Sequence, residues 1–110
     1  MDAEALADLF GPLGPIRTRK MFGGLGVWRG EAMFALVASN RVWMKADAAL
    51  AERYRAAGSE PFVYAGKRRP VTMSFWSLPE DALDDPDAAV AWARLSLAPA
   101  EAAARARGRG

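Results

Sequence analysis

The sequence predicts a two-layer α+β domain, with an antiparallel sheet packed against helices in the order helix, three or four strands, helix, two strands, helix. Two observations carry this prediction. Short runs with the two-residue period of strands are separated by glycine-rich or polar turns, and segments with helical spacing flank them. The chain has 110 residues and 52% hydrophobic content, which suits one hydrophobic core. We expect a single domain over residues 1–110, with a core at about 2–98 and an alanine- and arginine-rich tail at 99–110.

The first two predicted helices have clear start and stop signals. Asp2 can cap a first helix whose leucines recur at helical spacing and which ends at Gly11-Pro12. Asp47 can cap a second helix that runs through Ala57 and stops at Gly58.

The last predicted helix begins near Pro79 or, more strongly, at Asp85-Pro86, where an N-cap and a first-turn proline stand together. From Pro99 onward the tail either extends this helix or frays, and the sequence leaves both outcomes open.

Six strand-length runs are expected, at residues 16–22, 25–29, 32–38, 41–46, 62–65 and 71–76. Gly23-Gly24, Gly30-Glu31 and Ser39-Asn40 separate the first four runs, and these residue types tolerate the positive φ of hairpin turns. The links are too short for parallel crossovers. We therefore expect an antiparallel meander, with no helix between Leu25 and Ala46.

Large apolar side chains occur on both faces of the predicted middle strands. Strict alternation places on one face Val27, Met33, Ala35, Val37, Val42 and Met44, and on the other Trp28, Phe34, Leu36 and Trp43. We expect one face to meet the helices and the other to be partly covered or to pair with another subunit.

Histidine and cysteine are both absent from the chain. The commonest acid/base catalyst and metal ligand, the thiolate nucleophile and the disulfide are therefore all missing. We expect no structural metal and no tightly bound cofactor. No apolar stretch is long enough to span a bilayer, and the acidic start is unlike a signal peptide, so we expect a cytoplasmic protein without membrane contact.

Acidic residues cluster at Glu80-Asp81 and at Asp84-Asp85-Pro86-Asp87. Paired carboxylates can support hydrolysis or bind a hard cation, which is the one basis for an enzymatic hypothesis. The cluster lies where a helix begins, and negative charge is favoured there. Helix-start signals are therefore the preferred interpretation, and we expect no catalytic residues.

Basic residues supply the candidate partner-binding site. The candidates lie on the first strand and at the tip of the last hairpin, and they are Arg17, Arg19, Lys20, Lys67, Arg68 and Arg69. If they meet on one side, they can form a surface for nucleic acid or for an acidic protein. The alternative is a solvated strand edge, where charge prevents unwanted strand pairing. The net charge of +2 does not separate these hypotheses.

A longer cluster resembles a known family. Its residues are Arg19-Lys20-Met21-Phe22-Gly23-Gly24-Leu25-Gly26, Met33-Phe34-Ala35-Leu36, Trp43-Met44-Lys45, Phe62, Tyr64, Met73-Ser74-Phe75-Trp76, Leu78-Pro79-Glu80 and Trp92-Ala93. In order and spacing the chain is similar to the N-terminal domain of the TfoX/Sxy family, bacterial regulators associated with natural competence. The resemblance runs from about Leu9 to Leu97 and implies a stand-alone N-terminal domain. It also implies an α+β fold of the kind likened to secretion chaperones, with no catalytic residues.

Within this cluster we treat Met21, Phe22, Gly23 and Gly24 as a structural motif. Phe22 is predicted to point into the core, and Gly23 or Gly24 to adopt a positive φ.

Together these observations favour a non-enzymatic regulatory or adaptor domain whose partner is another protein, with a second copy of the chain as one candidate. The rival hypothesis is direct nucleic-acid binding through the basic strand and hairpin.

Overall fold

The computed structural model describes residues 2–21, 23–65 and 70–108. Its elements are α1 (Ala3–Leu9), the 3₁₀-helix η1 (Gly11–Leu13), β1 (Arg17–Met21), β2 (Gly24–Arg29), β3 (Ala32–Ala38), β4 (Arg41–Lys45), α2 (Ala48–Ala56), β5 (Pro61–Ala65), β6 (Pro70–Ser77), α3 (Glu80–Leu83) and α4 (Pro86–Gly108). The fold is α+β, as predicted.

The strands form one antiparallel sheet. Within the described residues it has six strands, in the order β1-β2-β3-β4-β6-β5. Because β2, β3 and β4 pair as successive antiparallel neighbours, the predicted meander is confirmed. Its β3–β4 turn is made by Ser39 and Asn40, both with the positive φ expected of a tight hairpin (53° and 60°).

Short polar side chains cap the helices where the sequence predicts. The Asp2 carboxylate accepts a hydrogen bond from the backbone N–H of Ala5, and that of Asp47 accepts one from Leu50, both at 2.9 Å. These bonds satisfy backbone donors that have no partner inside the helix.

Helix α4 continues through Pro99 to Gly108, which decides between the two outcomes left open for the tail. Proline inside a helix removes a backbone hydrogen bond, and packing compensates for that loss here. Ala100, one residue further on, is buried in the core. None of the described helices is both long and apolar enough to cross a membrane.

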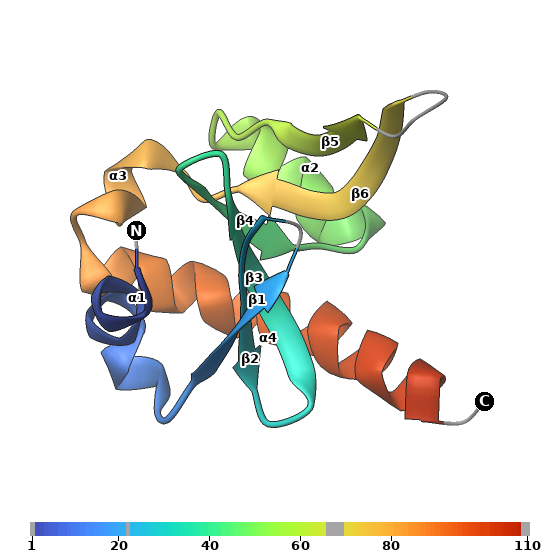
Figure 1. Ribbon diagram of the computed structural model, residues 1–110. Helices are drawn as coiled ribbons and strands as arrows, with labels where there is room; N and C mark the ends of the chain where they lie inside the picture. Colours follow the sequence, from blue (N-terminus) through green and yellow to red (C-terminus); the bar gives the residue numbers. More distant parts are fainter. Residues whose placement is uncertain (1, 22, 66–69, 109–110) are drawn as a thin grey trace.

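The main core lies between the sheet and the helices. Figure 1 shows α4 crossing behind the sheet, with α1 and α3 at its N-terminal end and the C terminus at the other. Its buried stripe is largely made of small residues, which let the helix approach β3 closely: Ala89, Val90, Ala93, Ser96, Leu97 and Ala100. Phe10, beside α1, meets Phe34 of β3 edge to face, with ring centroids 5.3 Å apart.

The strict alternation predicted for β3 is wrong at two positions. Val27 pairs with Ala35, but Trp28 pairs with Met33, so Phe34 is an extra residue in β3, a β-bulge. Phe34 and Ala35 therefore both face the helices, whereas Met33 packs against the cluster on the other face. The prediction had Met33 and Phe34 on the reverse faces. An added residue reverses the period-two pattern beyond it.

The second face of the sheet has a smaller core of its own. Its buried members are Leu36, Ala38, Trp43, Phe62 and Phe75, with Met21 and Met33 packed against them. The sheet curves over this second face. Between the pairs Pro61–Trp76 and Val63–Thr72, β6 has two more residues than β5, and Figure 1 shows β6 bending at the top of the molecule.

Helix α2 is held against α4 by Tyr54. Its ring stacks on Trp92 with centroids 4.5 Å apart, and its hydroxyl lies 2.6 Å from the hydroxyl of Ser96. Both Tyr54 and Ser96 are fully buried. Burial raises the pKa of Tyr54 well above its ordinary value of 10.0, so the hydroxyl stays neutral and bonded to its partner.

We expect Tyr54→Phe and Ser96→Ala each to lower the free energy of unfolding by about 1–3 kcal/mol, because each leaves a buried hydroxyl without its partner. The double variant should lose clearly less than the sum of the two, because no hydroxyl is then left unpaired. Chemical denaturation of the four proteins measures the coupling. Strict additivity would contradict the buried hydroxyl pair.

Candidate functional site

A hollow on the second face of the sheet combines an apolar floor with several cations. It has a volume of about 380 Å³. Its floor is formed by Met21, Trp28, Met33 and Phe75, and its cationic side chains are Arg17, Arg19, Lys45 and Arg107. Glu31, Ala100 and Ala103 complete the lining. We call these residues the basic hollow.

Strand β1 supplies one wall of the basic hollow. Arg17, Arg19 and Met21 alternate along the strand and line it, whereas Lys20 lies on the opposite face of β1. In a flat sheet β1 would lie about 19 Å from β6, four strand spacings away. Curvature of the sheet instead brings residues of both strands to the same hollow.

The opposite wall comes from β4 and from the last turns of α4. The β3–β4 pairing ends at Ala35 and Met44, so among the described strands none pairs with the start of β3 on that side. Lys45 of β4 and Arg107 of α4 border the hollow there. The helical continuation of the tail is therefore what brings Arg107 to the site.

Gly26 permits the floor to pack closely. A Cβ atom at this position would lie 2.5 Å from the sulfur of Met21 and 2.5 Å from the ring of Trp28. Such distances are far below normal contact, so both side chains lie over the bare backbone of β2. Glycine here lets Met21 and Trp28 cover the middle of the strand.

Lys45 is a partly buried cation of the basic hollow. Its ammonium lies 5.3 Å from the centroid of the Phe75 ring, which offsets part of the cost of its burial. Burial, together with the nearby Arg107 guanidinium, lowers the pKa of Lys45 below its ordinary value of 10.5. Both causes disfavour the charged form, and attraction to a bound anion would offset them.

The cations of the hollow have no carboxylate partner among the side chains that the structure describes. Ion pairs there join Arg41 to Glu60 and Arg55 to Glu52. Arg17 instead donates to the backbone oxygen of Gly30 at 3.2 Å and lies 5.4 Å from the centroid of the Trp28 ring. These contacts orient the guanidinium without neutralising it.

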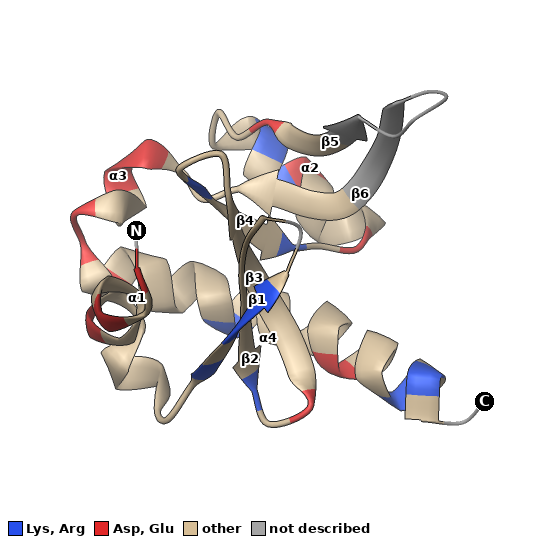
Figure 2. Ribbon diagram, in the orientation of Figure 1, with Lys and Arg blue, Asp and Glu red and all other residues tan. Residues whose placement is uncertain are grey.

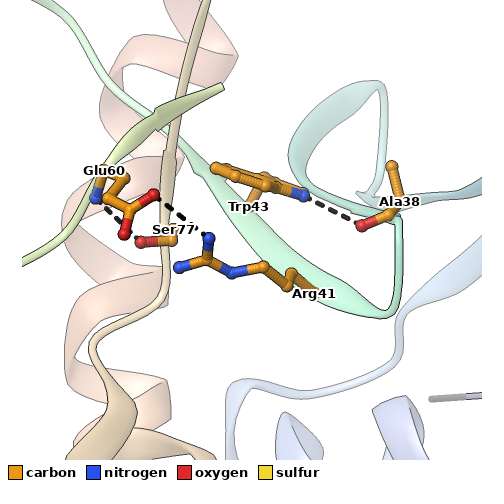
Figure 3. Close-up of polar contacts among 5 residues, drawn as sticks. All are labelled: Ala38, Arg41, Trp43, Glu60 and Ser77. Carbon is orange, nitrogen blue, oxygen red and sulfur yellow. Dashed lines mark hydrogen bonds and ion pairs between the residues drawn. The ribbon is translucent and has the colours of Figure 1, made fainter. Parts of the chain in front are cut away.

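Arg41 shows how a cation is used for structure in the same sheet. Its guanidinium lies 3.3 Å from the Glu60 carboxylate and beside the Trp43 indole, whose N–H donates to the oxygen of Ala38 at 3.1 Å (Figure 3). The backbone N–H of Glu60 donates to the Ser77 hydroxyl at 2.9 Å. The group ties β4 to the start of β5 and the end of β6.

The acidic side chains of α1 and α3 lie away from the basic hollow, whereas Glu31 lines it. Figure 2 shows Asp and Glu on α1 and α3, while Lys and Arg mark β1 and the C-terminal end of α4. The Asp85 carboxylate accepts from the backbone N–H groups of Asp87 and Ala88, at 3.1 and 3.3 Å, and so acts at the start of α4. Within the described residues, no three carboxylates gather closely enough to hold a metal ion.

Of the six candidate residues named from the sequence, the structure describes three. Arg17 and Arg19 meet in the basic hollow, Lys20 faces the other way, and 67–69 lie outside the described residues. The candidates named from the sequence included neither Lys45 nor Arg107. Alternation along the fourth strand could have indicated Lys45. No signal indicated Arg107, because its position depends on a helix that passes through a proline.

The structural motif can be followed at three of its four residues. Met21 packs on the second core, and Gly23 has a φ of 74°, which confirms the expected positive φ. A Cβ atom on Gly24 would lie 1.7 Å from the backbone oxygen of Val37, so only glycine fits beside β3. Phe22, predicted to point into the core, lies outside the described residues.

Comparison with known proteins adds the family. The sequence pattern of the TfoX N-terminal domain matches residues 8–100. The chain belongs to the TfoX N-terminal domain family. One curated relative, the DNA transformation protein TfoX1 of Aliivibrio fischeri (strain ATCC 700601 / ES114), is 31% identical over 68 residues. That segment is 62% of this chain and 32% of the relative, so this TfoX N-terminal domain spans about a third of the relative's length.

In this TfoX N-terminal domain we expect Lys45→Met to raise the free energy of unfolding at pH 7, by up to about 1 kcal/mol, since the group is partly exposed. The pKa of Lys45 is lower in the folded than in the unfolded state, so its charge destabilises the fold. This loss of stability is complete below the folded-state pKa and disappears above the unfolded-state pKa. The gain should therefore shrink as the pH approaches 10.5, and salt should reduce it by screening Arg107.

Denaturant melts of Lys45→Met measure this gain, with Arg94→Met as the matched control. Arg94 is an exposed arginine of α4 outside the basic hollow. A loss of stability in Lys45→Met would contradict the destabilisation assigned to the Lys45 charge.

Proposed function

We propose that this chain is a non-enzymatic regulatory adaptor domain that binds another protein through the basic hollow. The observation that carries the proposal is the convergence of four cations on an apolar floor, without carboxylate partners among the described side chains. Unpaired charge held at a partly apolar site is typical of binding surfaces, because folding alone gains nothing from it.

Membership of the TfoX N-terminal domain family supports a regulatory role. The relative in Aliivibrio fischeri is named a DNA transformation protein, and we extend that process, as a proposal, to this chain. The absence of histidine and cysteine favours binding over catalysis. Among the described residues, Glu31 is the one carboxylate that lines the hollow, so no carboxylate pair is available there.

Direct nucleic-acid binding is the second candidate, and the neighbouring Arg17 and Arg19 favour it. Phosphate contacts release counterions, so binding of this kind falls steeply with salt. A protein contact with an apolar centre is much less sensitive to salt. Salt dependence and nuclease treatment therefore separate the two candidates.

We expect the tagged chain to retain a protein partner from lysate of its own organism after nuclease treatment and at moderate salt. A double variant, Arg17→Glu with Arg19→Glu, should lose that partner, because it reverses the charge of one wall of the hollow. Exposed substitutions of this kind usually change stability by about 0.5 kcal/mol or less, and thermal melts check this.

Arg53→Glu with Arg94→Glu is the matched control, since both arginines are exposed on helices outside the hollow. It should keep the partner. Recovery of nucleic acid alone, or of the same proteins by both double variants, would overturn the proposal.

A further inference from the structure

We propose that the basic hollow takes an acidic peptide segment bearing one bulky apolar side chain, with Lys45 contacting a carboxylate of that segment. The inference rests on the proposed function and names the chemistry of the partner.

The positive charge of the hollow predicts a negatively charged ligand. Arg17, Arg19, Lys45 and Arg107 face one hollow, with Glu31 as its one described carboxylate. On the wall opposite β1, the Arg107 guanidinium repels the Lys45 ammonium. A carboxylate placed between them would replace this repulsion with charge-assisted hydrogen bonds.

The apolar floor of the hollow predicts that the ligand also carries an apolar side chain. Met21 and Met33 are only partly buried, and both line the hollow. Methionine adapts to apolar partners of different shapes. At about 380 Å³ the hollow lies near the lower end of the roughly 300–1,000 Å³ typical of ligand pockets, which suits a side chain better than a large cofactor.

The aromatic rings favour a peptide over nucleic acid. Single-stranded nucleic acid binds by stacking its bases on exposed aromatic faces. Here Arg17 lies over Trp28 and Lys45 lies over Phe75, at 5.4 and 5.3 Å from the ring centroids. A ring face that carries a cation of the same protein is not available to a base.

The position of β1 gives an extended segment access. Among the described residues β1 pairs with β2 alone and ends the sheet, and its inward residues Arg17, Arg19 and Met21 line the hollow. A peptide that runs beside this edge would direct alternate side chains towards the hollow.

Methyl NMR tests the proposal directly, using the full chain with ¹³C-labelled methionine methyl groups. The probe is the peptide acetyl-Glu-Glu-Phe-Glu-Glu-amide. We expect it to shift the methyl signals of Met21 and Met33 but not that of Met44, which is fully buried in the main core. Replacing the peptide's phenylalanine by alanine, or its glutamates by lysines, should remove most of the shift.

Lys45→Met should weaken the peptide about tenfold or more, because it removes a charge-assisted hydrogen bond while keeping a side chain of similar length. Arg94→Met, outside the hollow, should leave the affinity unchanged. Denaturant melts confirm that both variants are folded.

The inference is overturned if the acidic peptide shifts neither methyl, if Lys45→Met binds it as tightly as the parent, or if an oligothymidylate shifts the same methyls at lower concentration. If the peptide does not bind but lysate still yields a nuclease-resistant protein partner that depends on Arg17 and Arg19, then only the proposed peptide chemistry is wrong. Recovery of nucleic acid alone from lysate would remove the proposed function itself.

Discussion

The extra residue in β3 is the constraint on which both faces of the sheet depend. The bulge at Phe34 lets Phe34 and Ala35 enter the helix-facing core together, and it turns Met33 to the opposite face. Without it, alternation would bury Met33 under α4 and place the Phe34 ring in the hollow. The bulge also lies near the point where β3 leaves β4, the opening that Lys45 and Arg107 border.

Local chemistry made much of the fold predictable. The caps at Asp2 and Asp47 and the turn at Ser39-Asn40 each depend on a few neighbouring residues, so their sequence signals are sufficient. The bulge was not predictable in this way, because Met33 and Phe34 are both apolar and either can face a core. The course of α4 through Pro99 also depends on tertiary packing, here of Ala100, which overrides the local preference.

The candidate site was predictable only in part, because it is assembled from distant segments. Alternation along one strand brings Arg17 and Arg19 together, and that was visible in the sequence. Bringing Lys45 and Arg107 to the same hollow as Arg17 and Arg19 requires curvature of the sheet and a continuous α4. The resulting site carries repulsion that folding does not require, while Arg41 in the same sheet is neutralised by Glu60. This contrast is the physical basis for assigning binding to the hollow.

Nuclear Overhauser spectroscopy of the aromatic and methyl protons tests the central claim most directly, because it reports which face each β3 side chain occupies. The account predicts cross-peaks between the rings of Phe34 and Phe10, whose centroids lie 5.3 Å apart, and between the Met33 methyl and side chains of the second core. Cross-peaks from Met33 to Phe10, with Phe34 contacting Trp28 and the second core instead, would show regular alternation and contradict the account.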